Sequence, residues 1–126
     1  MKQMIGTSSA PKPAGTYSQA IKSNNTVYIS GQIGISPDTD EMITESFSAE
    51  ARQVFHNLYA VAKAAGGDLN QIVKLTIFLM DLADFPVVNT IMTELFNKPY
   101  PARSTFQVAA LPAGARIEVE AVMVVQ

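Results

Sequence analysis

Several kinds of residue are scarce or absent from this chain of 126 residues, which has no cysteine and only one histidine, His56. Without cysteine there can be no disulfide framework, no thiolate zinc site and no cysteine nucleophile. A single histidine argues against a Ser-His-Asp triad and against a histidine metal site. The net charge is −2 and lysine and arginine do not cluster, whereas a dedicated nucleic-acid binder normally presents a basic face. Nucleic acid is therefore not an expected partner.

Long apolar runs are also missing. No stretch is long enough to span a bilayer, and the N-terminal polar run from Gly6 to Gly15 lacks the apolar core of a signal peptide. No membrane partner is therefore expected, and a cytoplasmic location is the default. Since 48% of the residues are hydrophobic and 16% are charged, we expect one globular domain over residues 1–126.

The first part of the chain is expected to contain little regular structure. Residues 1–15 contain two prolines and are expected to be irregular. A short strand is expected from Tyr17 to Lys22, and the β-branched and aromatic run at residues 26–30 predicts a second strand. Gly31 and Gly34 are expected to interrupt that strand.

Apolar residues recur at helical spacing between residues 47 and 65, which predicts a helix. Ser46 is a suitable N-cap, and Glu50 lies in the first turn, where the helix dipole favours a negative charge. The pair Gly66-Gly67 supplies a left-handed stop.

A second helix is expected from about Phe85 to Phe96, with Asp84 as its cap and Pro86 in its first turn. Its apolar stripe is expected to comprise Leu82, Phe85, Val88, Met92, Leu95 and Phe96. A strand over residues 72–80 precedes this helix, with Val73, Leu75, Ile77 and Leu79 on one face. Strands over residues 103–108 and 115–125 follow it.

The last strand is apolar on both faces. Ile117, Val119, Ala121, Met123 and Val125 share one face, and Val122 and Val124 share the other with Glu118 and Glu120. Two helices can cover only one face of an α+β sheet, so the second apolar face needs another cover. We therefore expect another subunit there, with functional sites at the subunit boundary.

Charged residues stand within two of these apolar strands. Arg103 lies in one, and Glu118 and Glu120 lie two residues apart, hence on one face, in the other. Burying a charge is costly unless it is paired or used on a ligand, and the guanidinium fork suits a planar carboxylate. These residues predict a site that binds a small carboxylic acid and that has a carboxylate of the protein nearby.

Two structural alternatives stay open for these charges. Arg103 could be an interface arginine paired with Glu118 or Glu120, and the glutamates could lie on a solvated edge. The neighbouring Val122 and Val124 argue against a solvated edge. A carboxylate in an apolar cleft tends to have a raised pKa, which suits the activation of water near neutral pH.

Five segments of the sequence, in order and at consistent spacing, resemble the RidA/YjgF family of small enamine/imine deaminases. They are residues 15–20, 30–34, 73–89, 101–104 and 117–121, which read GTYSQA, SGQIG, VKLTIFLMDLADFPVVN, PARS and IEVEA. The match extends over nearly the whole chain.

The resemblance implies a chorismate-mutase-like α+β fold, with a mixed sheet and two helices packed on one face. It also implies a homotrimer with three clefts between subunits. The implied activity is that of a 2-iminobutanoate/2-iminopropanoate deaminase, which hydrolyses enamines and imines of the 2-aminoacrylate and 2-iminobutyrate type to 2-keto acids and ammonia. Neither a cofactor nor a metal is implied, and the expected partner is a small 2-imino or 2-keto acid.

The same resemblance assigns roles to individual residues. Arg103 would hold the substrate carboxylate, and Glu118 would orient or activate the attacking water. Tyr17 would line the pocket across the subunit interface, and Ser30 and Gly31 would form another wall.

Asn89 and Thr105 also match substrate-binding positions of the family. Thr105 stands where the family often has cysteine, and Thr16 replaces a proline, which loosens the backbone at that turn. If residue 105 acts through its backbone N–H, threonine preserves the contact, and we favour this interpretation. A required thiol would leave the protein inactive.

Two other functions stay open. The same cleft could bind 2-keto acids as a regulatory module without turnover. Older names in the family suggest an RNA-directed or translation-inhibiting role, against which the acidic composition counts. The sequence does not determine which imine is preferred or which pyridoxal-phosphate enzyme supplies it.

Overall fold

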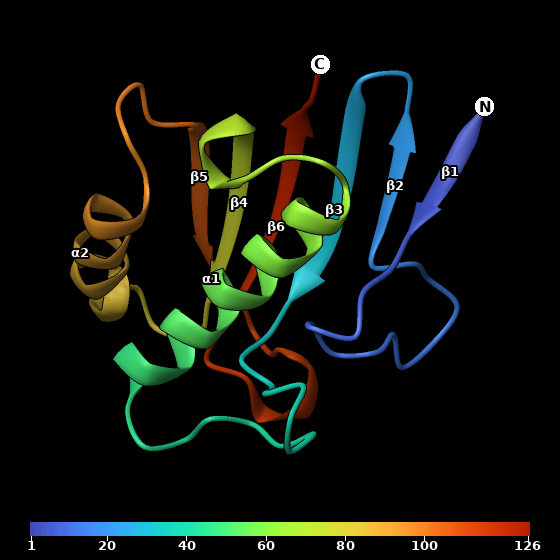
Figure 1. The fold of residues 1–126 in the computed structure, drawn as a ribbon. Helices are drawn as coiled ribbons and strands as arrows, with labels where there is room; N and C mark the ends of the chain where they lie inside the picture. The colour runs from blue at the N-terminus through green and yellow to red at the C-terminus, as the bar shows by residue number, and fades with distance from the viewer.

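The computed structural model describes residues 1–126 and contains one six-stranded sheet. The strands are β1 (Lys2–Ile5), β2 (Ala20–Ser23), β3 (Thr26–Gln32), β4 (Ile72–Leu79), β5 (Ala102–Gln107) and β6 (Ile117–Val124). Their order across the sheet is β1-β2-β3-β6-β4-β5, and only β4 and β5 run parallel to each other. The expected mixed sheet of an α+β fold is therefore confirmed (Figure 1).

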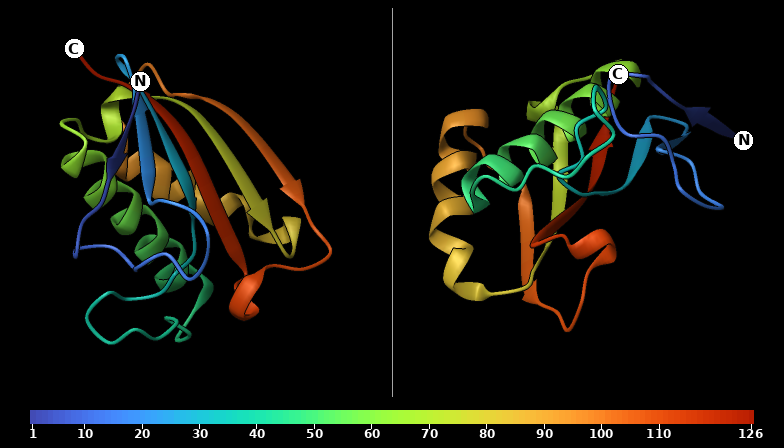
Figure 2. Two further views of the ribbon diagram at one scale, coloured as in Figure 1. Left: turned by 90° about the vertical axis from the view of Figure 1, so that its right-hand side faces the viewer. Right: turned by 90° about the horizontal axis from the view of Figure 1, so that it is seen from below.

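Both α-helices cover the same face of the sheet. Helices α1 (Phe47–Ala64) and α2 (Phe85–Leu95) pack against each other there, and the opposite face carries no helix (Figure 2). Three short 3-10 turns connect the elements, at Leu69–Gln71, Leu82–Asp84 and Pro112–Gly114. A cluster of 27 buried hydrophobic residues forms the core. The position of both α-helices on one face confirms the arrangement that the sequence predicted.

Helix α1 has the boundaries that the sequence predicts. The Ser46 hydroxyl accepts a hydrogen bond from the N–H of Ala49 at 3.0 Å, which satisfies one of the free donors of the first turn. Beyond its last turn, Gly66 adopts a φ of +93°, a conformation that glycine adopts without steric cost.

Helix α2 begins differently from the prediction. Asp84 precedes it but makes no side-chain capping bond, because it ends a 3-10 turn that is itself capped by Asp81. Pro86 lies in the first turn, as predicted. The apolar stripe is only partly correct: Val88, Met92 and Phe96 are buried and Phe85 is partly buried, whereas Leu82 and Leu95 are exposed.

The N-terminal prediction was wrong in two places. Lys2–Ile5 forms the strand β1, which pairs antiparallel with β2, although residues 1–15 were expected to be irregular. Strand β2 begins at Ala20 and not at Tyr17. Since β1 is an edge strand that depends on a distant partner, nothing in its own sequence pattern marks it.

Strand β3 continues through Gly31 to Gln32 instead of ending at Ser30. Its pairing with β6 shifts register between Ile29 and Gln32, which is a β-bulge at Ser30 and Gly31. The predicted interruption is therefore a local irregularity within one strand.

Strand β4 buries Leu75, Ile77 and Leu79 as expected, but Val73 is 48% exposed. Its pairing with β6 shifts register between Ile72 and Lys74, so Ile72 takes the buried position instead. The alternation along β6 is as predicted, with Ile117, Val119, Ala121, Met123 and the following Val125 buried.

The face without helices carries large apolar side chains. Tyr28, Phe106 and Val124 are 53%, 52% and 42% exposed, and Phe106 stacks on the partly exposed Phe78 at 6.5 Å between ring centroids. This open face, as we call it below, is the one that the sequence predicted to need a second cover. Neither α-helix combines the length and apolar character that crossing a membrane requires.

Candidate active site

Arg103 lies on the edge strand β5, and its side chain projects onto the helix-covered face of the sheet. Its Nη1 donates a hydrogen bond to Oδ1 of Asn89 at 2.7 Å and lies 3.5 Å from Sδ of Met92. Its guanidinium carbon lies 4.8 Å from the ring centroid of Phe85, within the range of a cation–π contact. Three side chains of α2 therefore hold the guanidinium in one orientation.

The remaining edge of this guanidinium is available. Nε and Nη2 of Arg103 make no hydrogen bond within the chain, and these two nitrogens can hold both oxygens of a carboxylate. Arg103 borders a hollow of about 380 Å³ that it shares with Leu82, Phe85 and Thr105. A second hollow of about 400 Å³ adjoins Arg103 and Asn89.

Thr105 has the same orientation as Arg103 because it lies two residues further along β5. Successive N–H groups of a strand point to opposite sides, and the N–H of Val108 donates to the carbonyl of Leu79 in β4. The N–H of Thr105 therefore points to the free edge of the sheet, where a bound anion can accept it. The Thr105 hydroxyl is buried and has no hydrogen-bond partner.

Glu118 lies on β6 between the buried Ile117 and Val119, so its side chain projects onto the open face. A Cβ added to Gly31 would lie 2.0 Å from Oε2 of Glu118, so the carboxylate lies directly against the glycine backbone. Burial raises the pKa of Glu118, and the charge of Glu120 raises it further.

Ser30 and Tyr17 are the other two predicted pocket residues. The Ser30 hydroxyl donates to the carbonyl of Ser18 at 2.6 Å, which ties the bulge of β3 to the segment before β2. Tyr17 is 51% exposed, and its hydroxyl accepts a hydrogen bond from the N–H of Ala14 at 3.3 Å. Both residues belong to the part of the molecule that holds Gly31 and Glu118.

The predicted residues therefore form two groups on opposite faces of the sheet. Arg103 pairs in register with the buried Leu75 on the helix-covered face, whereas Glu118 pairs with Phe78 on the open face. Within one chain Arg103 makes no ion pair with Glu118 or Glu120, and the interface pairing that the sequence left open stays a prediction. We call Arg103, Thr105 and Asn89 the anchor group, and Glu118, Gly31, Ser30 and Tyr17 the carboxylate group.

Two residues that contact the guanidinium of Arg103 were not predicted as part of the site. Phe85 and Met92 were expected only as core residues, yet both contact the guanidinium. Their positions relative to Asn89, four residues before and three after, place all three on one face of α2. That spacing is the signal that could have identified them.

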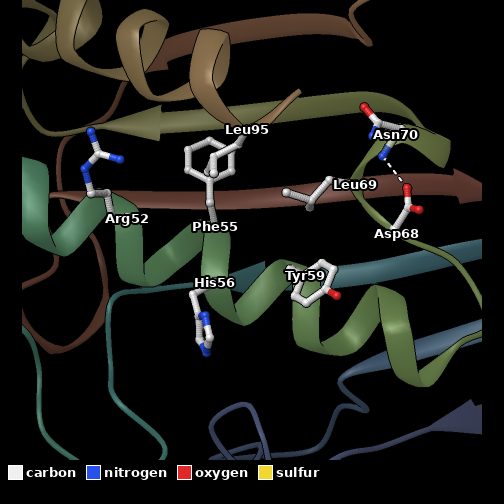
Figure 3. Close-up of a pocket in the computed structure, with 8 residues that line it drawn as sticks. All are labelled: Arg52, Phe55, His56, Tyr59, Asp68, Leu69, Asn70 and Leu95. Carbon is white, nitrogen blue, oxygen red and sulfur yellow. Dashed lines mark hydrogen bonds between the residues drawn. The ribbon is translucent and has the colours of Figure 1, made fainter. Parts of the chain in front are cut away.

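A separate hollow of about 490 Å³ lies on the helix side of the molecule (Figure 3). The side chains of Phe55 and Leu95 both line it, and Arg52, which also lines it, is paired with Glu94 at 2.9 Å. It contains none of the predicted site residues, and its arginine is already neutralised. No three histidine, aspartate or glutamate side chains are grouped as metal ligands.

Comparison with known proteins agrees with this fold. The sequence model of the family described as Endoribonuclease L-PSP matches residues 7–125. A protein of Dermatophagoides farinae named 2-iminobutanoate/2-iminopropanoate deaminase is 47% identical over 125 residues, which are 99% of this chain and 98% of that protein.

Solved structures give the same result. The crystal structure of RidA from the Antarctic bacterium Psychrobacter sp. has a TM-score of 0.94 and 50% identity, over 98% of this chain and 99% of that one. The structure of the YjgF gene product from E. coli has a TM-score of 0.91 and 40% identity, over 98% and 99% of the two chains. The chain therefore belongs to the RidA/YjgF family, the family of the Endoribonuclease L-PSP model.

Proposed function

We propose that this protein hydrolyses small 2-imino acids, and the enamines in equilibrium with them, to 2-keto acids and ammonia. The observation that carries the proposal is the guanidinium of Arg103, which α2 holds while its Nε and Nη2 stay free for a carboxylate. The similarity to the Dermatophagoides farinae protein named 2-iminobutanoate/2-iminopropanoate deaminase supports the imine deaminase activity.

We propose further that the working site combines two copies of the chain. In 2-iminobutyrate the carboxylate of the substrate is bonded directly to the imine carbon. The anchor group and the carboxylate group of the protein must therefore both lie within a few ångströms of the same small molecule. Within one chain they lie on opposite faces of the sheet, with β4 between their strands. One copy therefore supplies Arg103 and the next supplies Glu118.

A homotrimer is the assembly we propose, with one site at each of its three interfaces. The exposed Tyr28, Phe106 and Val124 support the burial of the open face by neighbouring copies. We also propose that residues 1–126 act as one domain, which the single sheet and single core cluster support. The cytoplasmic location stays a prediction.

The proposed reaction begins with the carboxylate of the substrate on Nε and Nη2 of Arg103 and on the N–H of Thr105. Glu118 takes a proton from a water molecule, whose oxygen bonds to the imine carbon. Glu118 then returns this proton to the nitrogen, which gives a carbinolamine. Glu118 next moves the hydroxyl proton of the carbinolamine to the amino nitrogen as the C–N bond breaks, so ammonia leaves and the carbonyl forms. The raised pKa of Glu118 suits a group that both takes and returns a proton.

The remaining predicted residues have supporting roles in this proposal. Asn89 orients Arg103 instead of touching the substrate. Ser30 maintains the bulge that carries Gly31, and Tyr17 forms a wall of the cleft.

A second candidate is a regulatory module that binds 2-keto acids without turnover. The anchor group favours it, because Arg103, Thr105 and their hollow are complete within one chain and can bind a carboxylate alone. An RNA-directed role would need a basic surface, and the net charge of −2 does not support one.

A coupled assay tests the proposal. A pyridoxal-phosphate-dependent threonine dehydratase would generate 2-iminobutyrate, and the appearance of 2-ketobutyrate would be followed with and without this protein. The deaminase would be supported if the protein accelerates the appearance of 2-ketobutyrate, if Arg103→Ala abolishes this acceleration, and if the control Arg52→Ala retains it. A folded protein that gives no acceleration but binds 2-ketobutyrate saturably would select the regulatory module.

A further inference from the structure

Helix α1 carries a buried carboxylate that the proposed reaction does not use. Glu50 is 1% exposed, and both of its oxygens accept hydrogen bonds from Arg116, the residue immediately before β6. Oε2 accepts from the backbone N–H and Oε1 accepts from Nε, each at 2.7 Å. Nη2 of Arg116 has no partner, so Glu50 alone fixes the guanidinium.

The same side chain packs against the chain that leaves β3. A Cβ added to Gly34 would lie 2.7 Å from Cγ of Glu50, so the two residues are in direct contact. Further along α1, the fully buried Asn57 donates to the carbonyls of Ile33 and Ile35 at 3.0 and 2.9 Å. Helix α1 thus holds the end of β3 and the start of β6 with buried polar side chains.

These two held segments adjoin the contact between Gly31 and Glu118. Gly34 follows Gly31 by three residues, and Arg116 precedes Glu118 by two. Because β3 and β6 pair antiparallel, the end of β3 and the start of β6 lie at the same end of the sheet. The distance between the two strands at this end therefore depends on what Glu50 holds.

Building on the proposed role of Glu118, we propose that Glu50 is a positioning residue for the reaction. Through Arg116 and Gly34 it holds β3 and β6 at the spacing that keeps the Glu118 carboxylate against Gly31. A buried ion pair adds little stability compared with well-packed apolar residues, so stability alone is a weak reason for its presence. A displacement of about 1 Å near reacting atoms can lower a rate by roughly 100-fold.

Glu50→Gln tests this proposal because it keeps the shape of the side chain but sets an amide NH₂ against a donor of Arg116. We expect kcat to fall by about 10-fold or more while KM changes by less than about 2-fold, since Arg103 is untouched. Glu94→Gln, which breaks the exposed ion pair with Arg52 on the helix side, is the matched control and should leave both parameters unchanged.

A smaller folded fraction would also lower the apparent kcat, so the deciding measurement is the pKa of Glu118 by carboxyl ¹³C NMR. In Glu50→Gln the carboxyl of Glu118 should gain solvent, and its pKa should fall toward the ordinary glutamate value. The acid limb of the kcat profile should move to lower pH with it. Glu120 is the charged neighbour on its own strand, whereas Gly31 and Phe78 on β3 and β4 are uncharged, so a changed pKa reports changed burial.

Arg116→Lys provides a second test, because this side chain is 40% exposed and its replacement is less disruptive to folding. Arg116→Lys should reproduce both the fall in kcat and the fall in the pKa of Glu118. In the double variant, kcat should be no lower than in Glu50→Gln alone. An unchanged Glu118 pKa in both folded single variants would overturn the proposal. A wild-type protein without imine hydrolysis would instead reject the proposed function, and the pKa comparison would still decide whether Glu50 positions Glu118.

Discussion

Oε2 of Glu118 occupies the space that a side chain on Gly31 would fill, since a Cβ built on Gly31 would lie 2.0 Å from it. The contact exists because β3 bulges at this point and brings the glycine backbone over β6. The absence of a side chain at residue 31 thereby determines where the carboxylate lies.

Gly31→Ala should move the Glu118 carboxylate while leaving the fold intact. We expect kcat to fall by roughly 10-fold to 100-fold with a smaller change in KM, because the anchor group is not altered. Gly6→Ala is the control, since its added Cβ would meet only Oε1 of Gln19 at 3.7 Å. Steady-state kinetics of the two variants is the measurement. Equal activities of Gly31→Ala and Gly6→Ala would show that the position of Glu118 does not limit the rate.

Mixing two inactive variants tests whether each site combines two copies. Arg103→Ala and Glu118→Gln each remove one group, but an interface formed by the intact Arg103 of one copy and the intact Glu118 of another is complete. Unfolding and refolding the two together at equal amounts should restore about a quarter of the wild-type activity, as expected for random assembly of a cyclic oligomer. A mixture as inactive as its components would show that both groups act from the same chain.

Thr105→Val should leave activity unchanged and raise stability. The buried hydroxyl of Thr105 has no partner, and an unsatisfied buried polar group costs about 1–3 kcal/mol. Urea unfolding should therefore show a gain of about 1 kcal/mol in the free energy of unfolding. Since the backbone N–H is retained, loss of activity in the folded variant would instead assign the hydroxyl a role in the chemistry.

Glu118→Gln should stabilise the protein at neutral pH. Burial and then Glu120 raise the pKa of Glu118 in the folded protein. The stability that the protonated carboxyl contributes is fully present below the unfolded pKa, about 4.3, and is lost as pH rises through the folded pKa. Unfolding experiments should therefore show the variant to be more stable than wild type at neutral pH, with the difference vanishing near pH 4. Equal stability at neutral pH would mean that the charged carboxylate is well solvated.

Local sequence patterns were sufficient for α1 and for the faces of β6. The cap at Ser46 and the stop at Gly66 act within one turn of the helix, so the boundaries follow from adjacent residues. The alternation along β6 needs only the twofold period of a strand. Strand β1 and the register shift after Ile72 could not be predicted, because both depend on pairing with distant strands.

The sequence by itself determined the family, the two-helix α+β fold and the identity of the charged residues that carry the proposed chemistry. Only the tertiary structure decided that Arg103 and Glu118 lie on opposite faces, that α2 orients the guanidinium, and that Gly31 lies against the carboxylate. The physical reason is that residue type and side-chain alternation are properties of neighbouring residues. Which face of a sheet a side chain joins depends on strand pairing and register between segments far apart in the chain.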